Sequence, residues 1–274
     1  MSAPDYRERA PVAALGDYVR CVWTFEGPAS DTPQPIAPDG CCELIVHRAE
    51  PYSELVAETY RLQRPVFFAG QLTAPLTLLA REPVAVIGVR FQPWAARAFL
   101  GVNADRATDQ RLDLEALHGA TVSALLREVR EAPSLEAAAV ITEAYVVERV
   151  RGVALNVDVR ATVEAMQEEK EPTSPDATSE RQWQRRFKAE VGVSERQLQS
   201  VLRFRRVFDV IEGPGPLGWV EAALAAGYFD QPQMARDFRR YLGVSSRQWA
   251  AQKLGLAKAL TVSQTYKNEG GGTR

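Results

Sequence analysis

The feature that most constrains this chain is an internal repeat near its C-terminal end. Residues 185–197 align without a gap with residues 236–248, at a constant offset of 51 positions. Arg, Phe, Gly, Val, Ser, Arg and Gln coincide in the two copies. A gapless match of this kind predicts two copies of one supersecondary unit.

Each copy of the repeat has the pattern of a capped helix. Ser179 and Asp230 are favoured N-cap residues, and Gly192 and Gly243 lie where the two helices must end. The expected inward residues are aromatic or apolar: Trp183 and Phe187 in the first copy, Met234 and Phe238 in the second. Beyond each glycine a serine can cap the next helix, and Gln197 completes a capping box with Ser194.

The second copy extends into a complete helix-turn-helix pattern. An alanine-rich helix is expected over Leu217–Ala226 and ends at Gly227, so the whole reads as helix, glycine-containing turn, helix. Gln233, Arg236 and Arg240 then follow i, i+3, i+7 spacing and share one outward stripe. Arg and Gln suit the major groove because they pair with guanine and adenine edges. Arg239 and Lys188 are better placed for phosphates.

A long helix over Glu195–Glu212 would join the two copies. With such a linker the copies could read two successive major-groove faces about 34 Å apart. The alternative is a helical bundle with a solvated, arginine-rich surface. The charge distribution bears on this choice: residues 179–253 hold eleven Arg and two Lys against eight acidic residues, a net +5, although the whole chain carries −2. The remainder is therefore at −7, and this asymmetry favours contact between the basic segment and nucleic acid.

The first 115 residues are mainly β in pattern. Alternation over Asp17–Glu26 predicts a strand with Val19, Cys21, Trp23 and Phe25 on one face. Further strands are expected over Cys41–His47, Val66–Ala69, Leu76–Ala80 and Val84–Gln92. From about Leu112 the period becomes helical, with Ser134 and Asn156 as expected N-caps. Glu43 and Arg90 lie within strand patterns and become candidate ligand contacts if either faces inward.

Composition limits the classes of chemistry. The chain of 274 residues holds two histidines and three cysteines, too few for a histidine-rich metal site or a secreted disulfide framework. Cys41 and Cys42 would face opposite ways in a strand and cannot easily chelate one ion, so we expect buried structural cysteines. No apolar run reaches the ~18 residues needed to cross a bilayer, and no signal peptide is expected. A cytoplasmic protein with no cofactor and no metal is the resulting expectation.

These stretches resemble the DNA-binding domain of the AraC family of bacterial transcription regulators. The residues that carry the resemblance are Ser179–Gly192, Gly227–Gln231 and Phe238–Gln248. More weakly, Ala37–Leu44, Phe68–Gln71 and Val86–Pro93 resemble a β-rich domain found ahead of such domains. The resemblance implies a cupin-like N-terminal domain that senses a small molecule or forms a homodimer. It also implies double-stranded DNA as partner, and RNA polymerase as a further contact.

By position, the resemblance assigns two sets of DNA-binding residues. The first recognition helix would present Arg181, Gln182, Gln184 and Arg185, and the second Gln231, Gln233 and Arg236. One departure concerns the alanine-containing positioning helix that family members have before the first recognition helix. The corresponding segment here, Met166–Pro175, holds four charged residues and two prolines, so the first motif is eroded. We therefore expect the second motif to carry more of the binding, or the helix over Val153–Met166 to hold the first.

The expected organisation is an α+β multidomain chain. A β-rich sensing or dimerisation domain spans 1–115, a helical connector 116–152, a double helix-turn-helix domain 153–253, and a flexible tail 254–274. The expected function is that of a sequence-specific transcription regulator rather than an enzyme. Two alternatives stay open: a helical interaction module that has lost DNA binding, and a metal-dependent cupin reaction, for which one histidine in the β-rich segment offers too few ligands.

Overall fold

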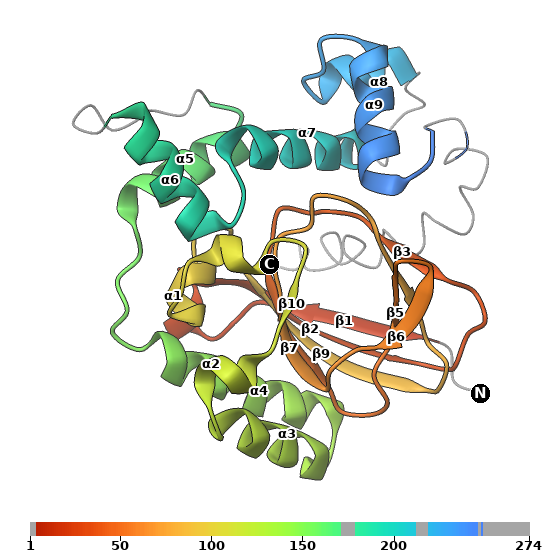
Figure 1. Ribbon diagram of the computed structural model, residues 1–274, viewed down its shortest axis with the longest axis vertical. Helices are drawn as coiled ribbons and strands as arrows, with labels where there is room; N and C mark the ends of the chain where they lie inside the picture. The colour runs from red at the N-terminus through yellow and green to blue at the C-terminus, as the bar shows by residue number, and fades with distance from the viewer. Residues whose placement is uncertain (1–3, 171–178, 212–218, 246–247, 249–274) are drawn as a thin grey trace, which may run out of the picture.

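A computed structural model describes residues 4–170, 179–211, 219–245 and 248 of the chain. A β-rich N-terminal part is followed by a helical C-terminal part, and the two parts lie at opposite ends of the view in Figure 1. The tail expected over 254–274 and most of the expected loop at 168–176 lie outside the described residues.

Two antiparallel sheets make up the N-terminal part. The larger sheet has the order β1-β2-β9-β4-β7-β10 and the smaller has the order β3-β8-β5-β6. Their strands are β1 (Asp5–Arg9), β2 (Val19–Gly27), β3 (Gln34–Ile36), β4 (Glu43–His47), β5 (Ser53–Val56), β6 (Thr59–Leu62), β7 (Val66–Ala69), β8 (Leu76–Leu79), β9 (Val84–Phe91) and β10 (Arg111–Leu112). The expected strands are thus confirmed as β2, β4, β7, β8 and β9, whereas β1, β3, β5, β6 and β10 were not expected.

Both faces of the larger sheet are covered. One face, with Leu44, Ile87 and Val89, packs against helices, and the other, with Ile45 and Val86, faces residues of the smaller sheet. The period-2 prediction for β2 is wrong at one residue. Val19 belongs to the helix-covered face with Val22, because the pairing of β2 with β9 shifts register between Val19 and Cys21. Such a bulge inverts the alternation on one side of it.

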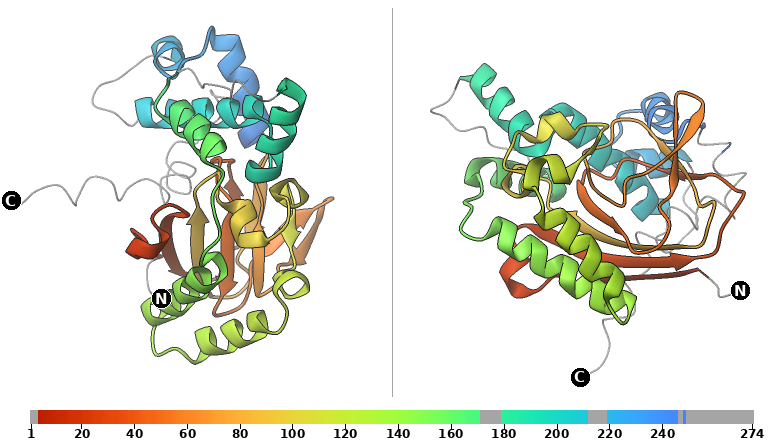
Figure 2. Two further views of the ribbon diagram at one scale, coloured as in Figure 1. Left: turned by 90° about the vertical axis from the view of Figure 1, so that its left-hand side faces the viewer. Right: turned by 60° about the horizontal axis from the view of Figure 1, so that its bottom comes forward.

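Helices α1 (Ala96–Leu100), α2 (Leu114–His118), α3 (Thr121–Glu131) and α4 (Leu135–Val150) follow the strands. Ser134 caps α4 as predicted, with its hydroxyl accepting from the backbone N–H of Ala137. Figures 1 and 2 show α3 and α4 at the end of the β-rich part that faces away from the C-terminal helices. The buried carboxylate of Glu143 fixes α4 by accepting from Arg9 at 2.9 Å and from the backbone N–H of Val12 at 2.6 Å.

The C-terminal part consists of α5 (Val157–Gln167), α6 (Glu180–Val191), α7 (Glu195–Ile211), α8 (Trp219–Ala225) and α9 (Gln231–Leu242). The long helix α7 carries α6 near one end and α8 with α9 near the other (Figure 1). Phe204 and Phe208 of α7 pack with Phe238 and Tyr241 of α9 in one aromatic cluster. This cluster fixes α9 on α7 by apolar burial.

The two parts share a continuous core. Val191, Val193 and Leu198 belong to the same hydrophobic cluster as the helix-covered face of the larger sheet. Polar contacts add to it: Arg97 of α1 pairs with Glu190 of α6 at 2.6 Å, and the Thr108 hydroxyl donates to the Gly192 carbonyl at 2.6 Å. The end of α6 is therefore seated on the β-rich part.

Candidate nucleic-acid interface

The structure folds both copies of the repeat as the sequence predicts. Ser179 and Asp230 are N-caps whose side chains accept from the backbone N–H groups of Gln182 and Gln233. Gly192 and Gly243 end α6 and α9 with φ values of 98° and 72°, in the left-handed region that favours glycine. Ser194 and Ser245 each pair with a glutamine three residues on in a capping box.

The outer face of α6 carries every DNA-contact residue expected there. The inward side chains Trp183 and Phe187 are buried, and the expected contact residues are all exposed: Arg181, Gln182, Gln184, Arg185 and Lys188. The amide of Gln184 donates to Glu180 at 2.9 Å, one turn earlier. Four of these five side chains can therefore meet a partner directly, and Gln184 must first leave Glu180.

The outer face of α9 is also basic. Met234 and Phe238 are buried, and the exposed contact residues expected on this helix are Gln231, Arg236, Arg239 and Arg240. Gln233 is different because it is half-buried and its Oε1 accepts from the backbone N–H of Phe229 at 3.0 Å. Together with the bond from its backbone N–H to Asp230 at 2.6 Å, this ties Gln233 to the residues that begin α9. Its amide can reach a base only through Nε2, a constraint that the sequence pattern alone did not reveal.

Asp237 ties α9 to the rest of the motif. Its Oδ2 accepts from the Tyr228 hydroxyl at 3.0 Å and from the Ser200 hydroxyl at 3.2 Å. Arg203 of α7 lies 3.7 Å from the same oxygen and stacks over the Tyr228 ring at 4.8 Å. Burial, together with the Asp237 carboxylate, raises the pKa of Tyr228. The turn, α9 and α7 are thereby joined through one carboxylate.

A different helix stands ahead of α6. The segment that would align with α8 begins at the end of α5, and residues 171–178 lie outside the described residues. Helix α5 contacts its neighbours through ion pairs: Asp158 with Arg186 of α6 at 3.7 Å, and Glu169, just past α5, with Arg206 of α7 at 3.3 Å. Arg206 also donates to the Met166 carbonyl at 3.3 Å.

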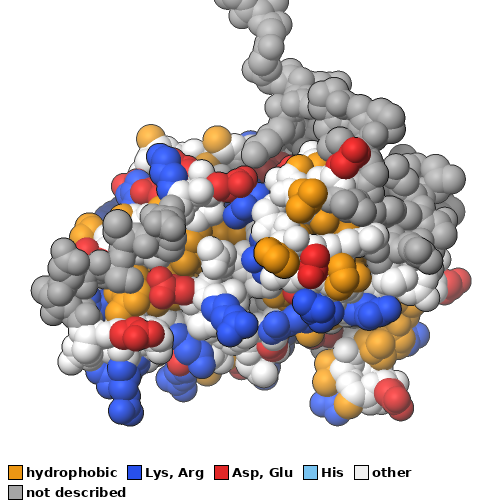
Figure 3. Space-filling model, turned by 90° about the horizontal axis from the view of Figure 1, so that it is seen from above, with side chains coloured by type: hydrophobic (Ala, Val, Ile, Leu, Met, Phe, Trp, Pro, Cys, Tyr) orange, Lys and Arg blue, Asp and Glu red, His pale blue; other side chains and the backbone are white. Residues whose placement is uncertain are grey.

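Seen from the side of the C-terminal helices, several Lys and Arg side chains form a row across the lower half of this face (Figure 3). Lys and Arg contribute affinity for a phosphate backbone and a dependence on salt. The arrangement therefore offers two exposed helical faces and a basic surface, which together suit a DNA duplex.

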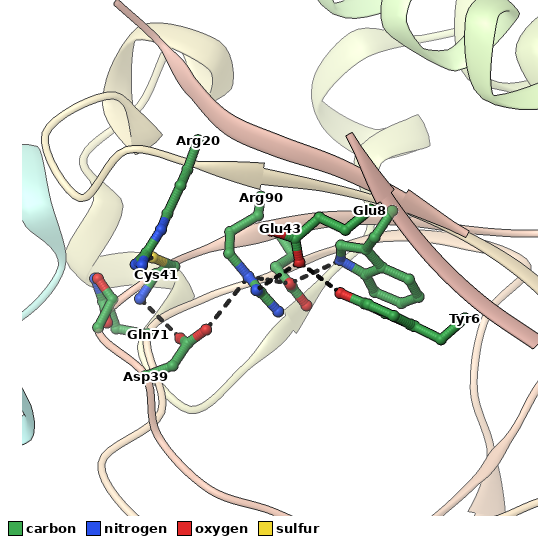
Figure 4. A network of polar contacts seen from close by, with 10 residues as sticks. Tyr6, Glu8, Arg20, Asp39, Cys41, Glu43, Gln71 and Arg90 are labelled. Carbon is green, nitrogen blue, oxygen red and sulfur yellow. Dashed lines mark hydrogen bonds and ion pairs between the residues drawn. The ribbon is translucent and has the colours of Figure 1, made fainter. Parts of the chain in front are cut away.

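A second candidate site lies inside the β-rich part, where Glu43 and Arg90 both face inward rather than toward solvent. Arg90 lies 2.9 Å from Glu43 and 3.3 Å from Asp39, and the Trp23 indole donates to Glu43 at 3.0 Å (Figure 4). Burial raises the pKa of Glu43, and Arg90 opposes this rise. Arg205 of α7 is half-buried, and burial lowers the pKa of its guanidinium while the nearby Asp39 raises it.

The cysteines are buried and free of disulfides. Burial raises the pKa of Cys41 to about 11, which makes the thiol a poor thiolate nucleophile at neutral pH. Across the described residues there is no group of three or more His, Cys, Asp or Glu side chains that could hold a metal ion. None of the described helices is long and apolar enough to cross a membrane.

Two family models match the chain. Residues 7–113 match a domain of unknown function, DUF6597, and residues 177–252 match a helix-turn-helix domain. Among curated proteins, none matches significantly. The second match covers both copies of the repeat, so the helix-turn-helix prediction is confirmed.

Solved structures that resemble the chain are distant. ToxT from Vibrio cholerae O395 is 11% identical, with a TM-score of 0.42 over 85% of this chain and 97% of that chain. Wild-type ToxT from Vibrio cholerae strain SCE256 bound to an unsaturated fatty acid is 9% identical, with a TM-score of 0.42 over 82% and 92%. The AraC-like transcriptional activator CuxR is 14% identical, with a TM-score of 0.34 over 94% and 89%. Likeness at this level assigns no ligand to the chain.

Proposed function

We propose a mode of DNA binding for this chain, whose residues 177–252 form an AraC-type helix-turn-helix domain. In this mode α9 reads base edges in the major groove, chiefly through Gln231 and Arg236 and through the Nε2 of Gln233. Arg239 and Arg240 lie toward the other end of α9 and contact phosphates. The observation that supports this is the exposed basic face of a helix whose position is fixed by Asp237 and the aromatic cluster on α7.

The first copy of the repeat serves mainly to hold the duplex. Arg181, Arg185 and Lys188 are exposed on α6, where cations attract phosphates whatever the base sequence. Helix α5 supports the first copy: Asp158 of α5 pairs with Arg186 of α6, and Glu169, just past α5, pairs with Arg206 of α7. Gln182 and Gln184 then add a smaller contribution to sequence preference.

The experiment that tests this proposal begins with selection of duplexes from random DNA by the full chain. Affinity for a selected duplex is then measured over a series of salt concentrations. Contacts between the basic side chains and several phosphates predict a steep negative slope of log K against log salt. A flat slope, or no enrichment of any sequence, contradicts DNA binding by these helices.

For the N-terminal part we propose a cupin-like domain that senses a small molecule. Two facing antiparallel sheets and the inward pair of Glu43 and Arg90 support this assignment. Asp39, a partner of Arg90, lies next to Gly40, where an added Cβ would lie 3.2 Å from the Leu198 side chain on α7. A ligand that competes for Arg90 would release Asp39 and so disturb the contact with α7.

The test of sensing is a screen of small molecules by the melting temperature of the full chain. A ligand that raises the melting temperature and changes DNA affinity supports the proposal, and Arg90→Gln should then remove both effects of the ligand while DNA binding remains. A ligand response unaffected by Arg90→Gln contradicts the assignment of this residue. Homodimer formation and contact with RNA polymerase belong to the same proposal, as does the division into 1–115, 116–152 and 153–253.

A further inference from the structure

The turn before α9 displays an aromatic ring to solvent. Phe229 is 89% exposed, whereas Tyr228 beside it is 3% exposed. Burial of a phenylalanine ring makes one of the larger favourable contributions to the free energy of folding. Phe229 makes no such contribution because its ring stays in solvent. An apolar ring in solvent is a candidate contact for a partner.

The backbone on both sides of this ring is fixed. The N–H of Tyr228 donates to the Ala223 carbonyl at 2.9 Å, and the N–H of Phe229 donates to the Gln233 Oε1 at 3.0 Å. Asp230 follows as the N-cap of α9. The ring is therefore held out by an ordered turn, and little conformational freedom remains to be lost when it meets a partner.

The position of the ring selects the partner. Phe229 directly precedes the N-cap of α9, and the N-terminal residues of a recognition helix are those that contact base edges in the major groove. The major groove has one apolar feature, the 5-methyl group of thymine, and phenylalanine is among the side chains that contact it. The polar neighbours Gln231 and Arg236 are suited to hydrogen bonds with the adjacent bases.

We propose that Phe229 packs against the 5-methyl group of a thymine in the operator and is a specificity-determining residue. The assignment rests on the proposed reading of the major groove by α9. It adds to that mode an apolar contact at one base pair, distinct from the hydrogen bonds made by the Gln and Arg side chains.

A methyl-deletion series on a selected duplex tests this assignment. Each thymine is replaced in turn by deoxyuridine, which keeps base pairing and removes only the methyl group, and affinity is measured for the full chain. One replacement should weaken wild-type binding about fourfold, the equivalent of one buried methylene. Phe229→Ala should weaken binding to the thymine duplex about tenfold. In this variant the same deoxyuridine should no longer change affinity.

The control is Val140→Ala, which shortens an apolar side chain that is 54% exposed on α4, at the far end of the molecule. It should bind as wild type and keep the full methyl dependence. Phe229→Leu should keep part of both effects. Equal losses on thymine and deoxyuridine duplexes in Phe229→Ala overturn the proposal, as do wild-type affinity in that variant and the absence of any methyl-sensitive thymine.

These outcomes separate the two proposals. If the wild-type chain selects a duplex with steep salt dependence but shows no methyl-sensitive position, only the role of Phe229 is wrong. If Phe229→Ala binds DNA normally but loses transcriptional response, the ring serves a protein partner and the thymine contact is wrong. If the wild-type chain selects no duplex, the proposed DNA-binding mode fails.

Discussion

The Tyr228 hydroxyl donates to the Asp237 carboxylate at 3.0 Å, and so joins the turn that precedes α9 to the middle of that helix. Ser200 and Arg203 of α7 meet the same oxygen. A carboxylate with hydrogen bonds from two hydroxyls and a nearby guanidinium is a strong local anchor. The orientation of α9 on α7 therefore depends on one acidic side chain in a helix whose outer face is basic.

Asp237→Asn should lower the stability of the C-terminal helices by about 1.5–3 kcal/mol, the usual worth of hydrogen bonds to a charged group. The amide keeps the shape of the carboxylate but not its charge. Urea unfolding followed by tryptophan fluorescence measures the change. Tyr228→Phe removes one of the three contacts of Asp237 and should lower the free energy of unfolding by a smaller amount. An unchanged urea midpoint in both variants would show that Asp237 does not anchor α9.

Arg236→Ala should weaken binding to a selected duplex by about 1–3 kcal/mol and relax preference at one base position. Arg236 is exposed on the α9 stripe with Arg240 and lies away from the buried Met234. Competition binding against single-base variants of the duplex measures both effects. Arg127→Ala, exposed on α3, is the matched control and should leave affinity unchanged.

Lys188→Ala should weaken binding to a similar extent on every sequence that binds. A phosphate contact carries no base information, so its removal should also lower the salt slope by about 1. Salt titrations of the variant and the wild type on two unrelated duplexes provide the comparison. A loss confined to one duplex would mean that α6 reads bases at this residue.

Acid should destabilise the protein between about pH 6.5 and 4. Burial lowers the pKa of both His47 and His118 from 6.5 to about 4, so the unfolded chain binds these protons first and stability falls as the pH falls through this window. Thermal melts over pH 4–8 measure the trend. His47→Phe, placed beside Phe67 and Tyr52, should flatten part of it; an identical pH profile in the variant would exclude His47 as a source.

The sequence predicted best what local interactions decide. The caps Ser134, Asn156, Ser179 and Asp230 were found because each bonds within its own first turn. The strand β7 was predicted to the residue, since its apolar run is short and bounded. Of the residues proposed for DNA contact, exposure agrees with the prediction at every position except the half-buried Gln233.

What escaped prediction depends on distant partners. The polar strand β1 forms because Asp5–Arg9 pairs with β2, and nothing in its own residues alternates. The face of Val19 is set by a register shift against β9. The inward placement of Glu43 and Arg90 follows from their pairing with each other across neighbouring strands. Two aromatic residues, Tyr228 and Phe229, follow Gly227 in the sequence. Which of the two is exposed became clear only from the structure, where Tyr228 is buried and Phe229 is not.

The contact between Thr108 and Gly192 makes the two copies of the repeat unequal. Their sequences are similar, yet a Cβ added to Gly192, which ends α6, would lie 3.3 Å from the Ala104 carbonyl. A Cβ added to Gly243, which ends α9, would have the Pro75 ring at 3.9 Å as its nearest neighbour among the described residues. Displacement of residues 104–108 should therefore move the C-terminal end of α6 as well. A conformational change in the N-terminal part would therefore alter the distance between α6 and α9, and a duplex bound to both helices would lose its contacts with α6 first.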